Sequence, residues 1–198
     1  MILASRSPRR RALLAAHGYT FETAPVAVAE VRPGEQGEPF AAVAENARRK
    51  ALAAAGAAGP GALVLAADTL LVFEGHSIGK PTDREEAARL LRRLGGATHR
   101  VATGVALLGD GVEEVFCEVT AVRLKRLTDA EIRAYHAAID PLDKAGGYDI
   151  DAHGPIAGGV VASIEGSYSN VMGLPMERVA PLLGRCLAGG SAGSARWC

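Results

Sequence analysis

The stretch from Leu3 to Leu14, LASRSPRRRALL, constrains the fold most because it joins a short strand directly to a helix. Residues 1–4 are apolar and predict a buried strand. Ser7 is a favourable N-cap, and Pro8 suits the first helical position because its missing N–H would have no partner there. The helix N-terminus, with its free N–H groups and positive dipole end, then predicts a receptor for an anion such as a phosphate chain. The side chains expected around it are those of Ser5, Ser7, Arg9 and Arg10. A capped surface helix with solvated arginines is the alternative.

Strand and helix signals alternate along the rest of the chain. Strands are expected at 19–24, 63–67 resuming at 70–73, 101–108, 112–122 and 160–164. Helices are expected at 39–55, 82–94, 128–138 and about 170–187, the second and third of them from capping boxes at Thr82 and Thr128. Loops are expected at 25–38, 74–81 and 140–159, and the Gly-Asp-Gly at 109–111 predicts a hairpin between the strands on either side of it. This order indicates a single α/β domain over residues 1–187, built on a mixed sheet, with a flexible tail at 188–198.

Composition narrows the class of protein. The 22 Lys and Arg residues balance 22 Asp and Glu residues, so the sequence lacks the basic excess of a general nucleic-acid binder. No apolar run approaches the length of a membrane span. The cysteines, Cys117, Cys186 and Cys198, are widely spaced without a CxxC pair, which is typical of a reducing cytoplasm.

A carboxylate and several cations are the candidates for chemistry. Asp68 follows the apolar run 63–67, where a charge is unusual, although an Asp that caps a turn is the alternative. Lys80 lies in a Gly-Lys-Pro loop, and Lys50 lies on the alanine-rich helix. Cations that hold a polyphosphate and an acid that holds a metal or activates water are what phosphoanhydride hydrolysis requires. The expected metal is Mg²⁺, held by Asp68 and by Glu30.

The sequence lacks the GxxxxGK[ST], GxGxxG, HExxH and GxSxG patterns of other common enzyme classes. Six segments instead resemble, in order, the motifs of the Maf family of nucleoside triphosphate pyrophosphatases. They are SRSPRR (5–10), ADT (67–69), GKP (79–81), TGV (103–105), DKAG with Tyr148 and Ile150 (143–150), and VMGLP (171–175).

The resemblance implies an elongated mixed sheet flanked by helices, with a cleft between two lobes, as in Maf and ITPase-like proteins, and a frequent homodimer. It also implies Mg²⁺-dependent cleavage of a nucleoside triphosphate to the monophosphate and pyrophosphate. Asp68 matches the family's proton acceptor, and Arg9 and Thr69 match positions tied to substrate choice. Lys50 and Lys80 match its phosphate-side lysines.

One position departs from the family pattern. Where the pyrimidine-preferring branch usually has Gln after Tyr-x-Ile, this chain has Asp151. An ionised aspartate only accepts hydrogen bonds, so it can bind the N3–H of thymine or uracil but cannot donate to a base carbonyl. The resemblance therefore favours dTTP and UTP as substrates, with Asp151 at the base. An Asp151 that points into solvent and selects nothing is the alternative.

Two other functions stay open at this point. A nucleotide-binding regulator of cell division, with slow or incidental hydrolysis, would bind a triphosphate tightly with little turnover. A purely structural α/β domain would leave the placement of Asp68 and Lys80 unexplained.

Overall fold

The computed structural model describes residues 1–31, 39–109, 111–151 and 155–189. Its centre is a mixed sheet of seven strands, in which β4 pairs with β3 beside the order β2-β1-β3-β5-β6-β7. The strands are β1 (Ile2–Leu3), β2 (Glu22–Thr23), β3 (Val64–Phe73), β4 (His76–Ile78), β5 (Thr98–Gly109), β6 (Val112–Leu124) and β7 (Val161–Glu165). β1 is parallel to β2 and β3, whereas the long strands β3, β5 and β6 are antiparallel. The expected α/β fold with a mixed sheet is confirmed.

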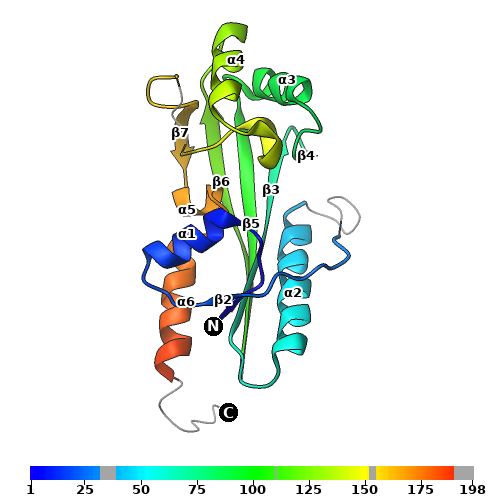
Figure 1. Ribbon diagram of the computed structural model, residues 1–198, viewed down its shortest axis with the longest axis vertical. Helices are drawn as coiled ribbons and strands as arrows, with labels where there is room; N and C mark the ends of the chain where they lie inside the picture. The colour runs from blue at the N-terminus through cyan, green and yellow to red at the C-terminus, as the bar shows by residue number, and fades with distance from the viewer. Residues whose placement is uncertain (32–38, 110, 152–154, 190–198) are drawn as a thin grey trace.

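Helices flank this sheet along its length (Figure 1). They are α1 (Pro8–Ala16), α2 (Pro39–Ala58), α3 (Arg84–Leu94), α4 (Asp129–Ala138), α5 (Tyr168–Val171) and α6 (Met176–Gly189), with short 3-10 turns η1 (Pro141–Asp143) and η2 (Ala145–Gly147). In the half that contains the N-terminus, α2 lies on one side of the sheet and α1 and α6 lie on the other. The helices α3 and α4 gather at the opposite end.

The side chains of β3 point alternately to the two faces of the sheet, and this alternation decides which helix each of them contacts. Val64 and Ala66 pack in a cluster with alanines of α2, whereas Leu65 and Ala67 pack with leucines of α1 and α6. Successive side chains of a strand point to opposite faces. Asp68 therefore faces α2, and the next residue faces α1.

The helix α2 approaches the sheet closely because small residues line the contact. Ala47 and Ala51 are fully buried. Gly104 of β5 pairs with Asp68 in the sheet, and a Cβ at Gly104 would lie 2.2 Å from the Val43 carbonyl oxygen of α2. Only glycine permits this approach, which brings polar side chains of α2 within reach of Asp68.

Several boundaries differ from the sequence expectation. β3 runs without a break through residues 68 and 69, because both residues keep their ladder pairing with β5. The expected loop 74–81 contains β4, which forms a hairpin with β3. α3 is capped by Asp83, one residue later than Thr82, since the Asp83 side chain accepts from the Glu86 N–H.

The C-terminal region also differs. The expected final helix is divided into α5 and α6, because Gly173 has a φ of 108° that no α-helix accommodates. α6 ends at Gly189, and residues 190–198 of the expected tail lie outside the described residues. Within the described chain, no helix combines the length and apolarity needed to span a bilayer.

Candidate active site

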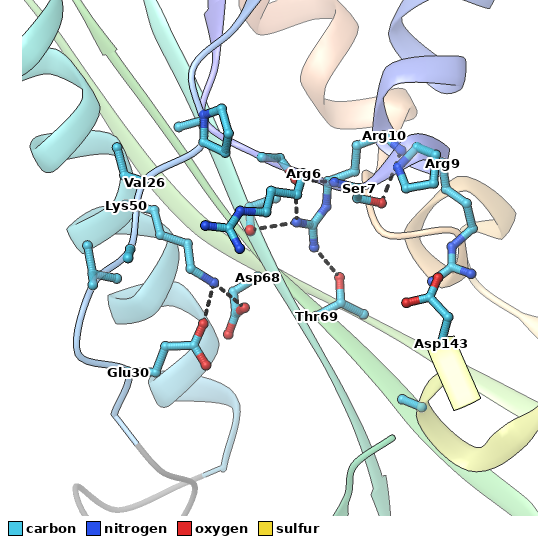
Figure 2. A pocket seen from close by; sticks show the side chains of 18 of the residues that line it. Arg6, Ser7, Arg9, Arg10, Val26, Glu30, Lys50, Asp68, Thr69 and Asp143 are labelled. Atoms are coloured by element: carbon cyan, nitrogen blue, oxygen red, sulfur yellow. Dashed lines mark hydrogen bonds and ion pairs between the residues drawn. The ribbon is translucent and has the colours of Figure 1, made fainter. Parts of the chain in front are cut away.

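A pocket of about 550 Å³ opens at the N-terminus of α1 (Figure 2). Ser7 caps this helix as expected, accepting at 3.5 Å from the Arg10 N–H. Ser5 Oγ accepts from the Ser7 N–H at 3.2 Å. Nine of the ten residues expected in the site line this pocket: Ser5, Ser7, Arg9, Arg10, Glu30, Lys50, Asp68, Thr69 and Lys80. The exception is Asp151.

Asp68 is held by two side chains of α2. Lys50 Nζ donates to Asp68 Oδ1 at 2.7 Å and also contacts Glu30 Oε1 at 2.7 Å. Asn46, one helical turn earlier, donates from Nδ2 to Asp68 Oδ2 at 3.1 Å. Figure 2 shows Lys50 between the two carboxylates. Each carboxylate oxygen keeps a second acceptor site, so Asp68 can still bind a water or a metal.

Asn46 is a residue that the sequence analysis missed. It is buried, and besides Asp68 it binds both backbone groups of Val31: the Val31 N–H donates to Oδ1 at 2.7 Å, and Nδ2 donates to the Val31 carbonyl at 3.1 Å. These bonds place the segment that carries Glu30 beside Lys50. The only signal in the sequence is a polar residue four positions before Lys50 on an otherwise alanine-rich helix.

Arg10 differs from the expectation of a guanidinium directed at a ligand. It donates to four protein acceptors: Gly173 O at 2.7 Å, Ala67 O at 2.8 Å, Thr69 Oγ1 at 2.8 Å and Ser5 Oγ at 3.1 Å. Burial lowers the pKa of Arg10 to about 10, while the charge of Asp68 opposes this shift. Arg10 therefore stays cationic at neutral pH and ties α1 to β3 and to the turn before α6.

Thr69 continues this connection across the sheet. Its hydroxyl lies 2.9 Å from Thr103 Oγ1, and Thr103 Oγ1 donates to the Asn170 carbonyl at 3.1 Å. This chain of hydrogen bonds fixes the Thr69 side chain at the edge of the pocket.

The pocket rim carries exposed cations. Lys80 is 60% exposed and donates to Asp143 Oδ1 at 2.5 Å. The hydrogen bond from Lys80 lowers the pKa of Asp143, so this pair is ionised at neutral pH. Arg6 also lines the pocket and was not singled out from the sequence.

A second, smaller cavity of about 60 Å³ adjoins the large pocket and shares Arg9, Thr69 and Ala145 with it. The remaining lining is mostly apolar: Leu71, Val101, Tyr148, Ile150 and Val171, together with Lys144 and Asp149. Tyr148 is buried, and its hydroxyl lies 2.7 Å from Nε2 of the buried His99. Burial lowers the pKa of His99 to about 4, so this histidine is neutral at pH 7.

Asp151 lies outside the lining of both cavities. Its side chain is an acceptor for the Tyr168 hydroxyl, and its backbone N–H donates to Asp149 Oδ1 at 3.0 Å. The residue is exposed. The structure therefore places the Asp151 carboxylate beside Tyr168 and outside both cavities.

The carboxylates in the large pocket fit a magnesium ion. Asp68 and Glu30 converge on one lysine, and Mg²⁺ binds one or two carboxylates together with phosphate oxygens and water. Among the described residues there is no group of three or more His, Cys, Asp or Glu side chains that would enclose a metal by themselves. The donor set therefore suits an ion that arrives with a phosphate substrate.

Comparison with known proteins gives a consistent result. The model of the family described as Maf-like protein matches residues 1–186. A dTTP/UTP pyrophosphatase of Salinibacter ruber is 48% identical over 181 residues, covering 90% of this chain and 87% of its own. One of Moorella thermoacetica is 46% identical, with coverages of 92% and 93%. The Ham1 protein of Staphylococcus aureus shares the fold, with a TM-score of 0.51 at 17% identity and coverages of 96% and 98%. The chain belongs to the Maf-like protein family.

Proposed function

We propose that the protein hydrolyses a nucleoside triphosphate to the nucleoside monophosphate and pyrophosphate, with a preference for dTTP and UTP. The proposal rests on the position of Asp68. Lys50 and Asn46 hold this carboxylate in the wall of a pocket that the N-terminus of α1 also lines. The relatives named dTTP/UTP pyrophosphatase support both the reaction and the base preference. The comparisons favour this enzyme over a regulator with incidental hydrolysis.

The triphosphate lies across the N-terminus of α1, where backbone N–H groups and the helix dipole favour negative charge. Arg9 and Lys80 bind the phosphate oxygens from the rim, and Arg10 adds its fixed charge from behind. Lys50 offsets the charge of the two carboxylates, which would otherwise repel the substrate.

Asp68 takes a proton from a water that attacks the α-phosphorus. The new bond joins the water oxygen to this phosphorus, the bond to the β-phosphate bridging oxygen breaks, and pyrophosphate leaves. Lys50 and the N-terminal end of α1 stabilise the added negative charge in the transition state. Mg²⁺, held by Asp68 and Glu30, would neutralise phosphate charge when bound.

The base enters the smaller cavity, which adjoins the phosphate pocket through Arg9 and Thr69. Its apolar walls suit the faces of an aromatic ring, and its small volume favours a single ring over the fused rings of a purine.

The product identity tests the reaction. Purified protein with Mg²⁺ and dTTP in ¹⁸O-labelled water is expected to release pyrophosphate and to place the label in the monophosphate. Asp68→Asn should abolish both products while the protein stays folded. Orthophosphate as the first product, or label in pyrophosphate, would contradict attack at the α-phosphorus.

The proposal extends to the setting of the enzyme. It acts as a cytoplasmic homodimer without a nucleic-acid partner. The family resemblance supports the dimer, the widely spaced cysteines support the cytoplasm, and the balanced charge argues against nucleic-acid binding. Light scattering coupled to size-exclusion chromatography checks the dimer, and a monomer at micromolar concentration would contradict it.

A further inference from the structure

The mostly apolar small cavity contains one ion pair in its lining, in addition to Arg9 and Thr69, which it shares with the large pocket. Lys144 Nζ lies 3.4 Å from Asp149 Oδ2, and the side chains are only 15% and 18% exposed. Both residues line the small cavity and neither lines the large one. The pair therefore places a hydrogen-bond donor beside an acceptor in the cavity wall. A phosphate-binding cluster would instead contain cations without a neighbouring carboxylate.

Asp149 is held rigidly from its backbone. The hydroxyl of Tyr135 donates to the Asp149 carbonyl at 3.0 Å and accepts from the Asp149 N–H at 2.9 Å. Tyr135 belongs to α4 and is fully buried in a core cluster that also contains leucines of α3. A side chain that discriminates between ligands must be held in place before the ligand binds, and the two hydrogen bonds to Tyr135 fix the backbone from which this carboxylate extends.

Asp151 is engaged elsewhere. Its carboxylate accepts from Tyr168, and its N–H donates to Asp149 Oδ1, which leaves Asp149 Oδ2 facing Lys144. Asp149 lies two residues before the position of the family's usual glutamine, and its carboxylate is the one that reaches the small cavity.

We propose that Lys144 and Asp149 together read the base of the substrate, and that Asp151 does not. This inference rests on the proposed function, because it assumes that the large pocket holds the triphosphate. Asp149 accepts the N3–H of uracil or thymine, and Lys144 donates to the adjacent carbonyl oxygen.

The chemistry of the pair favours uracil and thymine over cytosine. In uracil and thymine, N3–H lies between two carbonyl groups, so the pair finds a donor and an acceptor in either orientation of the ring. Cytosine has an unprotonated N3, and its only donor on this edge is the exocyclic amine. An ionised aspartate facing that N3 would be left without a hydrogen.

Two matched substitutions test the assignment. Asp149→Asn and Asp151→Asn make the same chemical change two residues apart, on either side of Ile150. An amide can donate to cytosine N3 as well as accept from uracil N3–H. Asp149→Asn is therefore expected to lower the ratio of kcat/KM for UTP to that for CTP roughly tenfold, while Asp151→Asn changes it less than twofold. Lys144→Met should raise KM for UTP without lowering kcat to the same extent.

A binding measurement separates this inference from the proposed function. Calorimetry with uridine and cytidine 5′-monophosphates needs no turnover, and the unsubstituted protein should bind the uridine compound more tightly. Asp149→Asn should reduce that difference, and its melting temperature shows whether the variant is folded. If the protein releases no pyrophosphate but the binding preference behaves as stated, the proposed function fails and the inference stands. If turnover is normal and only Asp151→Asn shifts the preferences, the inference is overturned.

Discussion

The two adjoining cavities differ in polarity, although nearby residues of the same strand, β3, line both of them. The large cavity is polar, and ion pairs such as that of Lys50 with Asp68 hold its carboxylates. The small cavity is mostly apolar, with one ion pair in its lining. Along β3, Asp68 serves the large cavity, Thr69 lines both and Leu71 serves the small one. The comparison shows that one strand can line a charged phosphate pocket and a mostly apolar ring pocket with residues only three positions apart, because successive side chains point to opposite faces.

Of the substitutions that test this difference between the cavities, removal of the Asp68 carboxylate should have the largest effect. Asp68→Asn should lower kcat for pyrophosphate release by roughly 10³-fold or more, because a positioned base contributes this order of rate. Nucleotide binding should persist, since the small cavity is unchanged. Steady-state kinetics and calorimetry check the two expectations, and a variant that keeps more than a tenth of the rate would contradict the role of Asp68.

Removing the connection that Arg10 makes between α1, β3 and the turn before α6 should affect stability. Arg10→Met breaks four hydrogen bonds and leaves the carbonyls of Ala67 and Gly173 without this donor, so the free energy of unfolding should fall by about 3 kcal/mol. Its neighbour Arg9 lines both cavities, so Arg9→Met should weaken nucleotide binding with little change in stability. Urea denaturation measures the free energy of unfolding of both variants. Equal losses would contradict this difference and show that the two arginines have the same structural role.

Acid should weaken the fold at His99, whose hydrogen-bond partner Tyr148 lines the small cavity. Burial holds the pKa of His99 at about 4, below its ordinary value of 6.5, so the unfolded chain binds more protons between these values. The stability contributed by neutral His99 is complete above pH 6.5 and is lost as the pH falls to 4, by roughly 3 kcal/mol. Urea denaturation as a function of pH should show a flatter acid slope in His99→Gln, which cannot titrate. An identical slope in both proteins would show that His99 does not carry this effect.

The smallest effect is expected at the rim of the large cavity. Lys80 is 60% exposed and paired with Asp143, so solvent screens its charge. Lys80→Met should raise KM for the triphosphate less than tenfold and leave the melting temperature nearly unchanged. Initial rates over a range of substrate concentrations measure this, and a loss of kcat as large as that of Asp68→Asn would mean that Lys80 acts on the reacting phosphate itself.

Local patterns were sufficient to predict much of the fold and the charged residues of the site. The N-cap at Ser7, the hairpin of β5 and β6, and the capping box at Thr128 were correct because each depends on residues a few positions apart. Asp68 and Lys50 were identified because a charge after an apolar run and a cation on an alanine-rich helix are visible in the sequence. The structure brings them together at 2.7 Å.

Other features were decided by tertiary packing. Arg10 donates to a carbonyl 163 positions away, so a side chain expected beside the ligand also connects distant parts of the fold. Asn46 reaches Asp68 only because Gly104 lets α2 approach the sheet. The placement of Asp149 in the small cavity, with Asp151 outside it, depends on Tyr135 and Tyr168 from other segments. The sequence by itself determined the elements and their charges, since these follow from neighbours along the chain. The tertiary structure decided which charges face a ligand and which face the protein, because that depends on contacts that exist only after the sheet and helices have packed.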